Sequence, residues 1–587
     1  MLGTSTWRER EFDATVQAAL VALGYPPIMA RLLAARGITA DGSAEYFDPS
    51  LKRLARPQQL PGVAEAVKVI SSFVREGREI IVFGDYDTDG VCASAILVSV
   101  IRRLGGQADA FIPERQSEGY GMTAASLTRM LGEHPRVGLV VTVDTGITSA
   151  AEVADLRSRG ISVVVTDHHL PPAAEEGGEV PLPVAEALID PKVESAPGFE
   201  CLCGAGVAFF LASALVEELR GEAEEKGILE KDARLAGPLI VLAGVATVAD
   251  LMPLRDQNRI LVAAAVSAFR ACAPIGLKEL MDRAARRAEA LVARDFAFLL
   301  APRLNASGRM DSARVSYDLV MASDREAARL LAVKVDGFNA SRKTEEQRMD
   351  REAREQVAKF EGLDAVVVAE ELRPAGSPPW NSGVAGIVAS RLLEDAHVPV
   401  AVVVGDHGSC RAPEGYNVRE ALDAAQSTLS RYGGHAAAGG FTVLPGKLEE
   451  FRRLFSEACS TQKVAAPDAA AIVFDGWLRP AEITMEFYER LRGMEPLGEG
   501  NPEPVFGLKG VFFSDARPMG QDGRHASFAF AGRSTPRGVW WNHGADAEEI
   551  RRHSATRYDV LFTITTSEYG TDVPHVELRI VDVRPAS

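Results

Sequence analysis

Cysteine is scarce in this sequence, with six residues in a chain of 587. The two that lie nearest each other, Cys201 and Cys203, lack the two-residue spacer of a zinc knuckle, and no second pair follows them. Sparse cysteines are typical of reduced thiols in the cytoplasm. We therefore expect a cytoplasmic protein without a disulfide framework or a structural zinc site.

Long hydrophobic runs are absent as well. The longest, around residues 239–249, is about half of the ~20 residues that span a bilayer. The opening residues, MLGTSTWRER, have no apolar segment after their positive charges, so we expect no signal peptide. These features argue against a transmembrane protein and predict no membrane partner.

Positive charge is in short supply. Lys and Arg number 64 against 81 Asp and Glu, which gives a formal net charge of −17. Nucleic-acid binding depends on Lys and Arg that neutralise phosphates, so this balance lowers the expectation of such a partner. Much of the acid is local, however, as in the glutamates of residues 217–225. A nucleic-acid site would therefore have to be a local positive groove.

A repeated alternation of short apolar runs and helical stretches extends from about residue 62 to residue 260. The runs are rich in Val and Ile and cover 80–83, 108–112, 138–143, 161–165 and 187–189. This pattern predicts an α/β fold with a mostly parallel sheet and crossover helices.

The rest of the chain predicts further parts. Residues 320–360 are charged and free of proline, which favours one extended helix with a solvated face joining two bodies. A second α/β unit is expected from 365 to 458. After a linker at 461–471, short strands separated by glycine turns predict a small β-barrel.

Residues 84–91, GDYDTDGV, place Asp85, Asp87 and Asp89 at alternate positions ahead of a glycine. An EF-hand calcium loop would need a bidentate Glu at its twelfth position, which is Ile96 here. It would also need a preceding helix, whereas residues 79–83 are a β-prone run. The calcium-loop interpretation therefore fails.

Other polar groups follow the ends of other apolar segments. Asp144 follows LVVTV, the triplet Asp167, His168 and His169 follows SVVVT, and Asp250 follows an apolar helix. Loops at the carboxyl ends of parallel strands meet in one crevice, so we expect these groups to converge with the first motif. Each motif alone is also explained by an ordinary turn or helix cap, but their occurrence together favours a site.

Converging carboxylates need a compensating charge. A pair at ~5 Å repels by roughly 1–3 kcal/mol, and no Lys or Arg lies within these motifs. A divalent cation is the natural solution, and Asp with His suits Mn²⁺, or Mg²⁺ with a water-rich shell. The carboxylates suffice for two ions, an arrangement that hydrolyses phosphoesters.

The succession D-x-D-x-D-G, V-D-x-G and T-D-H-H resembles the DHH phosphoesterase superfamily, which is named after the third motif. The resemblance implies a two-metal phosphoesterase that uses Mn²⁺ or Mg²⁺. The implied metal ligands are Asp87, Asp89, Asp144, His168 and Asp250, with Asp85 as a further one. Asp144 is also expected to be catalytic, and Asp167 and His169 to orient the site or contact the scissile phosphate.

Donor-rich loops supply candidate phosphate-binding residues. PRLNASGRM (302–310) carries Arg303, Asn305 and Arg309, and PERQSEGYG (113–121) carries Arg115. Three further motifs, WNSGVAGIVASRL (380–392), GSCR (408–411) and YGGHAAAGG (432–440), resemble the DHHA1 accessory domain. That resemblance implies substrate contacts by Ser409, Arg411 and His435. One position departs from the pattern, because Asn381 stands where the motif usually has His and an amide carries no positive charge.

The segment MEPLGEGNPEPVF (494–506), the strand-rich end and residues 31–67 resemble the RecJ family of bacterial single-strand-specific exonucleases. The resemblance covers nearly the whole chain and implies an α/β protein with a C-terminal OB-fold barrel. The expected parts are a helical segment at 1–60, a DHH catalytic domain at 61–320, a connecting long helix at 321–362, a DHHA1 domain at 363–462 and the OB-fold at 470–587.

This family implies 5′→3′ degradation of single-stranded DNA to 5′-mononucleotides, in recombination and repair. It also implies a single-strand-binding protein and a RecQ-type helicase as partners, and we expect a monomer. OB-folds stack bases on aromatic rings above a cationic groove. Candidates for these contacts are Arg524, Phe528, Arg533, Trp540 and Trp541, although one ring of the Trp pair must face the core.

Two alternatives remain open at this point. A DHH-type phosphodiesterase acting on short oligonucleotides or cyclic dinucleotides would not need residues 470–587. A catalytically silent DNA-binding scaffold on the same fold is the other alternative, and the intact set of metal-ligand candidates argues against it.

Overall fold

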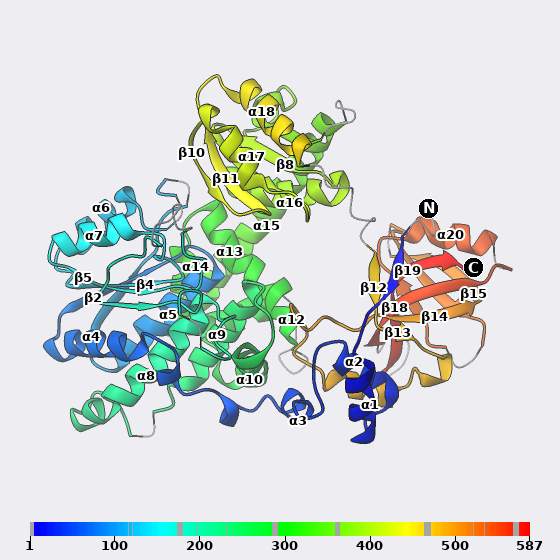
Figure 1. Cartoon of the computed structure of the whole chain (residues 1–587), viewed down its shortest axis with the longest axis horizontal. Coiled ribbons are helices and arrows are strands. Elements are labelled where there is room, and N and C mark those ends of the chain that lie inside the picture. The colour runs from blue at the N-terminus through cyan, green and yellow to red at the C-terminus, as the bar shows by residue number, and fades with distance from the viewer. Residues whose placement is uncertain are drawn as a thin grey trace. The chain divides into compact units, whose positions relative to one another are not determined.

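The computed structural model describes residues 5–586 except 116, 120, 173–179, 195, 232, 285–290, 359–363, 463–470, 521, 533–534, 554 and 568–573. The chain divides into two compact units, one comprising Met1–Ser50 with Asp468–Ser587 and the other Leu51–Pro467. Each unit has its own sheets and its own hydrophobic core, and Figure 1 shows the elements of both.

The larger unit begins with a five-stranded sheet in the order β3-β2-β4-β5-β6. Every neighbouring pair in it is parallel, which confirms the expected mostly parallel sheet. The strands are β2 (Glu79–Gly84), β3 (Gln107–Phe111), β4 (Leu139–Val143), β5 (Ser162–Thr166) and β6 (Ala187–Ile189). Strands β2, β4 and β5 are almost entirely buried, which explains their continuous apolar sequences.

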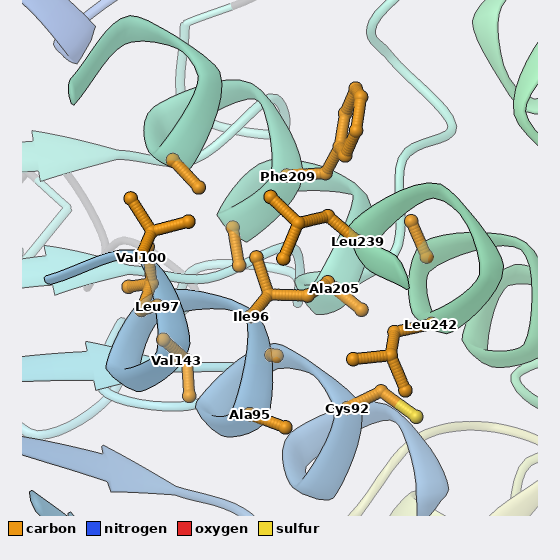
Figure 2. Packing of buried hydrophobic residues seen from close by; sticks show 14 of the residues in the cluster. Cys92, Ala95, Ile96, Leu97, Val100, Val143, Ala205, Phe209, Leu239 and Leu242 are labelled. Carbon is orange, nitrogen blue, oxygen red and sulfur yellow. The ribbon is translucent and has the colours of Figure 1, made fainter. Parts of the chain in front are cut away.

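Helices bury the apolar faces of this sheet: α4 (Val63–Glu76), α5 (Thr88–Arg103) and α8 (Gly204–Glu225) cover one face, and α6 (Ala124–Glu133) and α7 (Ala150–Ser158) the other. The further helices of this part pack on one another and on α5 and α8; they are α9 (Ala236–Ala249), α10 (Asp256–Cys272), α11 (Ile275–Arg283), α12 (Ala293–Asp295), α13 (Ala301–Met310) and α14 (Arg314–Met321), with shorter turns at Leu51–Arg53, Pro57–Gln59 and Phe296–Leu300. Figure 2 shows Ile96 of α5 among Phe209 of α8 and Leu239 of α9. Helix α9 is apolar on all sides because other helices surround it.

A single helix of 33 residues, α15 (Arg325–Val357), begins where the Asp324 side chain accepts a hydrogen bond from the Ala327 amide. It precedes a second α/β body (Figure 1), so the extended helix and the second body are both present as expected. That body has strands β7 (Val366–Ala369), β8 (Val400–Val404), β9 (His407–Arg411), β10 (Leu429–Gly434) and β11 (Ala438–Val443), and helices α16 (Ala385–Ala396), α17 (Val418–Ala424) and α18 (Leu448–Thr461), with turns at Glu370–Leu372, Ser382–Val384 and Gln426–Thr428. Its sheet has the order β10-β11-β9-β8-β7.

The smaller unit contains a seven-stranded sheet in the order β13-β14-β18-β19-β17-β16-β15. Its strands are β13 (Gly476–Trp477), β14 (Phe506–Val511), β15 (Phe513–Met519), β16 (His525–Phe530), β17 (Gly538–Trp540), β18 (Tyr558–Ser567) and β19 (His575–Pro585). Its helices are α19 (Met485–Arg492) and α20 (Gly544–Arg552), with a turn at Pro480–Glu482.

The N-terminal residues complete this smaller unit, a grouping that the sequence did not predict. Strand β1 (Trp7–Glu9) pairs in parallel with β12 (Ile472–Phe474). Helices α1 (Ala14–Ala22), α2 (Pro27–Ala34) and α3 (Ser43–Phe47) add apolar side chains to the same core as the strands. The buried Asp475 carboxylate accepts a hydrogen bond from the Arg10 guanidinium at 2.9 Å.

Among the described residues, no single helix combines the length and the apolar composition needed to cross a membrane. The pair α10 and α11 meets the test by length and composition only when the two are taken together, and it is bent by 93°.

Candidate active site

The first acidic motif lies in the turn between β2 and α5. Asp87 caps α5, because its Oδ1 accepts hydrogen bonds from the Asp89 amide at 2.8 Å and the Gly90 amide at 3.1 Å. Gly90 is required by a close approach, since a Cβ there would lie 2.4 Å from the Asp85 carbonyl oxygen. Asp85 is buried, and its Oδ1 has no hydrogen-bond partner among the described residues.

Helix α13 packs against this turn and forms hydrogen bonds with it. The Asn305 Oδ1 accepts hydrogen bonds from both the amide and the hydroxyl of Thr88, each at 2.7 Å. Gly308 packs against Tyr86, where an added Cβ would lie 3.0 Å from the carbonyl oxygen. Asn305 was predicted to bind phosphate, and the structure shows its carbonyl oxygen engaged by the first motif itself.

Asp89 links the first motif to the start of α8. Its two carboxylate oxygens accept hydrogen bonds from the amides of Gly204, at 2.6 Å, and Ala205, at 2.7 Å. An N-terminal helix end favours such a negative charge. Gly204 also lies against Asp144, because an added Cβ would be 2.5 Å from the Asp144 Cβ. Sequence reasoning missed both α8 residues, since a glycine and an alanine carry no ionisable group; the only signal was the small-residue run CGAG before an apolar helix.

Asp144 and His168 form the middle of the site. The His168 Nε2 lies 3.0 Å from the Asp144 Oδ1 and 3.6 Å from carboxylate oxygens of both Asp89 and Asp250. Asp144 has φ 59°, in the left-handed region that residues other than glycine rarely adopt. The four segments that the sequence placed at strand and helix ends therefore do converge.

Asp167 holds the histidine pair in place. Its Oδ1 lies 2.7 Å from the His169 Nδ1 and accepts a hydrogen bond from the His168 amide at 2.7 Å. Its Oδ2 accepts a hydrogen bond from the Ile147 amide at 2.9 Å. Because its Oδ1 holds both histidines and it belongs to none of the groups of ligand atoms described below, Asp167 is suited to orient the site rather than to bind an ion.

Burial and mutual repulsion strongly disfavour the ionised carboxylates when no cation is present. Burial raises the pKa of Asp85 and Asp144 well above the usual value, with the neighbouring carboxylates adding to the rise. Burial and Asp89 raise the pKa of Asp250 to about 8. Burial lowers the pKa of His168, which keeps its imidazole neutral, the form that binds metals.

His169 behaves differently from its neighbour. Burial would lower its pKa, but the hydrogen bond and charge of Asp167 outweigh burial and raise that pKa to about 9. Reciprocally, burial raises the pKa of Asp167, but His169 outweighs it and the net shift is downward. The pair therefore forms a charged hydrogen bond beside the carboxylate cluster.

The donor atoms group as metal ligands do. Within each of three groups, ligand atoms lie within 4.8 Å of one another: Asp85, Asp87 and Asp144; Asp89, His168 and Asp250; and Asp144, His168 and His169. Asp144 belongs to two groups, so its carboxylate could bridge neighbouring ions. His168 also occurs in two groups, but a neutral imidazole has one acceptor nitrogen and would bind a single ion. One oxygen each of Asp85 and Asp250 has no hydrogen-bond partner within the described part of the chain, which is consistent with divalent cations at this position.

Three of the predicted phosphate-binding arginines lie close together. Arg115 is near enough that, after burial, its charge contributes to lowering the pKa of Arg309, to about 10, and of Arg411. The Arg115 guanidinium lies over the Tyr86 ring at 5.1 Å. Ser409 and Arg411 approach the first turn of α16, where a Cβ on Gly386 would be 2.9 Å from the Arg411 Nη2. A cluster of cations beside helix α16 is suited to bind an anion.

Arg303 and His435 are placed differently. The Arg303 Nε forms an ion pair with Asp336 of α15 at 3.0 Å, and its Nη1 donates to the Leu299 carbonyl at 2.8 Å. Arg303 thus joins two helices. His435 is exposed beyond β10, where its amide donates to the Ala438 carbonyl at 2.8 Å.

Two of the expected base-stacking rings in the smaller unit are core residues instead. Phe528 is 0% and Trp540 5% exposed, and Trp540 stacks on His543 with ring centroids 3.8 Å apart. Successive strand residues face opposite sides, so the exposed ring of the pair is Trp541, at 51%. Arg524 is exposed beside Asp522, and Arg533 lies outside the described residues.

Comparisons with known proteins match this chain over most of its length. Family models match at residues 79–237 (DHH family, N-terminal domain), 364–461 (DHHA1 domain) and 474–582 (RecJ OB domain). The single-stranded-DNA-specific exonuclease RecJ of Escherichia coli is 38% identical over 520 residues, 85% of each chain. RecJ of Bacillus subtilis is 32% identical over 540 residues, 90% of this chain and 64% of that protein.

Solved structures agree with the sequence comparisons. The crystal structure of Thermus thermophilus RecJ in complex with Mn²⁺ has a TM-score of 0.80 and 29% identity, covering 99% of this chain and 80% of that one. A structure of exonuclease RecJ bound to manganese has a TM-score of 0.59 and 32% identity, covering 70% of this chain and 98% of that one. The chain belongs to the RecJ family of single-stranded-DNA-specific exonucleases.

Proposed function

We propose that this protein is a metal-dependent exonuclease that degrades single-stranded DNA from its 5′ end and releases 5′-mononucleotides. The observation that carries the proposal is the cluster of Asp85, Asp89, Asp144 and His168, which are buried, with Asp87 and Asp250, which are partly exposed. Relatives at 32–38% identity are named single-stranded-DNA-specific exonucleases, which supports the same substrate here.

These six residues would hold two divalent cations, Mn²⁺ or Mg²⁺, the ions bound in the solved Thermus thermophilus relatives. Bound ions supply an activated water and stabilise the leaving oxygen. Asp144 belongs to the group with Asp85 and Asp87 and lies 3.0 Å from His168, a member of the group with Asp89 and Asp250. Asp167 fixes the orientation of His169, whose protonated ring is available to the scissile phosphate.

Arg115, Arg309, Ser409 and Arg411 would hold the phosphate at the end of the strand. A clamp at a fixed distance from the metals measures one nucleotide from that end, which makes the enzyme an exonuclease. His435 is a further proposed contact to the strand. Arg303 and Asn305 support the site through α15 and the first motif.

The OB-fold unit would grip the strand with Trp541 and Arg524, by stacking and charge. Family membership further supports action in DNA recombination and repair in the cytoplasm. Cooperation with a single-strand-binding protein and a RecQ-type helicase, and a monomeric state, complete the proposal.

The decisive experiment incubates 5′-labelled single-stranded and double-stranded DNA with the protein and Mn²⁺. Immediate release of labelled mononucleotide from the single strand alone is expected. Asp144→Ala should abolish this release while DNA binding persists, since the phosphate clamp is intact. Cleavage by Asp144→Ala at the wild-type rate would contradict the metal assignment, and labelled products longer than a mononucleotide would contradict the exonuclease mode.

A further inference from the structure

An open cavity of about 700 Å³ lies in the larger unit, outside the acidic cluster. One wall is a face of α15 that carries Ser341, Thr344 and Glu345. The opposite wall is the segment from Pro379 to Ser382 ahead of α16, and Met310 also lines the cavity. This volume falls within the ~300–1,000 Å³ of small-molecule sites.

Helix α13 connects the cavity to the active site. Asn305 of this helix accepts hydrogen bonds from Thr88 of the first motif, and Gly308 packs against the Tyr86 carbonyl. Met310, two residues later, lines the cavity. Between them, Arg309 donates from Nη1 to the Gly383 carbonyl at 2.9 Å. The cavity therefore begins at the residue next to Arg309, one of the arginines that cluster beside α16.

The lining does not suit a phosphate. It contains no Lys or Arg, and its carboxylate, Glu345, is neutralised by an ion pair with Arg348 of the same helix. The remaining lining groups are neutral: the Asn381 amide, the hydroxyls of Ser341, Thr344 and Ser382, and the largely apolar Met310, Ala340, Pro379 and Trp380. The Asn381 Oδ1 accepts a hydrogen bond from the Gly383 amide at 2.7 Å and the Thr344 hydroxyl donates to the Ala340 carbonyl at 3.2 Å, so a ligand would meet chiefly the Asn381 Nδ2 and the serine hydroxyls. The Asn381 Nδ2 lies 3.8 Å from the Met310 Sδ, a weak acceptor, so a better acceptor can displace this contact.

We propose that this cavity holds the heterocyclic base of the strand's terminal nucleotide, whose phosphate faces Arg309. The inference rests on the proposed function and deepens it by adding a nucleobase subsite. A flat base buries its faces against apolar wall atoms, and its edge meets groups that both donate and accept hydrogen bonds. Hydroxyls and an amide adapt to any of the four bases, so the subsite senses the presence of a base and not its identity.

The test compares two DNA strands that differ only at the 5′-terminal residue, which carries either a base or an abasic site. A neutral hydrogen bond contributes ~0.5–1.5 kcal/mol, so KM for the abasic strand should rise roughly 2- to 13-fold with little change in kcat. In the same way, isothermal titration with Mn²⁺ present should show a deoxynucleoside 5′-monophosphate binding more tightly than deoxyribose 5-phosphate by a similar factor.

Variants assign the effect to this cavity. Thr344→Leu fills the cavity from an exposed helix position and should remove the preference for the base-bearing strand; Ser341→Leu serves as a second filling variant. Gln347→Leu adds an equal apolar group to the exposed surface of α15 outside the cavity lining and should keep the preference.

Two results would overturn the inference: equal affinity of the wild-type protein for the nucleotide and the sugar phosphate, or a full preference retained by both filling variants. Failure of the proposed function gives a different result, namely no degradation of either strand. The titration still decides in that case, because base-dependent binding lost in Thr344→Leu would support the subsite without any nuclease activity.

Discussion

Asp144 has an unusual backbone conformation and an unusual pKa for an aspartate. Its left-handed φ of 59° belongs to a class of strained conformations that cost ~1–3 kcal/mol and cluster at functional sites. Burial and nearby carboxylates raise its pKa well above the usual value. A protein maintains such a residue only where the surrounding structure holds it, here β4, His168 and the start of α8.

The pH dependence of stability follows from the same carboxylates. Below about pH 4 they are protonated in both folded and unfolded chains and contribute nothing. As the pH rises, the unfolded carboxyls ionise first, so the metal-free protein loses stability, for Asp250 up to about pH 8. The melting temperature in EDTA should therefore fall further below that in Mn²⁺ between pH 5 and pH 8. Asp250→Asn should reduce the difference between the melting temperatures in EDTA and in Mn²⁺. A difference that does not change with pH would contradict the proposal that these carboxylates bind the cations.

Replacing Asp167 by Asn tests its role as a positioning residue. The amide cannot retain the charge that keeps His169 protonated, so activity should fall by ~10–100-fold, as for other residues that orient metal sites. The concentration of Mn²⁺ needed for half-maximal rate should rise as well. Asp155→Asn, at an exposed ion pair with Arg159, is the control and should behave as wild type.

The first turns of two helices position the site. The Asp87 carboxylate accepts a hydrogen bond from an amide at the start of α5, and the Asp89 carboxylate accepts one at the start of α8. Gly204→Ala probes the contact between α8 and Asp144. The new Cβ would lie 2.5 Å from the Asp144 Cβ, so we expect ~1–3 kcal/mol of destabilisation and a loss of nuclease activity. Gly221→Ala in the same helix meets nothing within 4 Å and should be neutral or stabilising by up to ~1 kcal/mol. Chemical unfolding and nuclease rates measure both, and equal effects would contradict the close approach.

Of the adjacent tryptophans at the end of β17, Trp540 belongs to the core and Trp541 is exposed. Trp540→Ala removes a core ring and should destabilise the protein by ~3–5 kcal/mol. Trp541→Ala leaves stability unchanged and should weaken single-stranded DNA binding by ~1–3 kcal/mol, measured by fluorescence anisotropy. Unchanged DNA affinity in Trp541→Ala would remove this ring from the proposed binding surface.

The whole molecule consists of two units, and one of them is built from both ends of the chain. Residues 1–50 share a hydrophobic core with residues 468–587. Removing only the C-terminal tail would leave apolar residues of α2, such as Leu32 and Leu33, without their partners and favour aggregation. A chain of residues 51–467 should instead remain folded.

This truncated chain separates the remaining functional alternatives. It keeps every predicted metal and phosphate ligand, so it should still hydrolyse short oligonucleotides in Mn²⁺. Degradation of a long strand should slow, because the strand loses its OB-fold contacts. Full activity of the truncated chain on long strands would contradict the proposed grip of the OB-fold unit, and a full-length protein that hydrolyses short oligonucleotides but not long strands would favour the small-substrate phosphodiesterase.

Much of this architecture was predictable because the same local sequence pattern, an apolar run followed by polar residues, recurs along the chain. Val-rich runs followed by polar residues predicted parallel strands with carboxylates and histidines gathered at their ends, and the described structure has both. The burial of Trp540 and not Trp541 was not predictable, because strand alternation requires one inward ring without saying which.

The sequence by itself determined the identity of the ionisable groups, the parallel sheet and the family. Only the tertiary structure decided that Asp89 accepts hydrogen bonds from the first amides of α8, that Asp167 accepts one from the Ile147 amide, that Arg303 pairs with Asp336 of α15, and that Asn305 binds Thr88 of the first motif. It also decided that the first 50 residues join the C-terminal unit. The physical reason is that hydrogen-bond partners and burial depend on contacts between residues far apart in the chain, which no local pattern specifies.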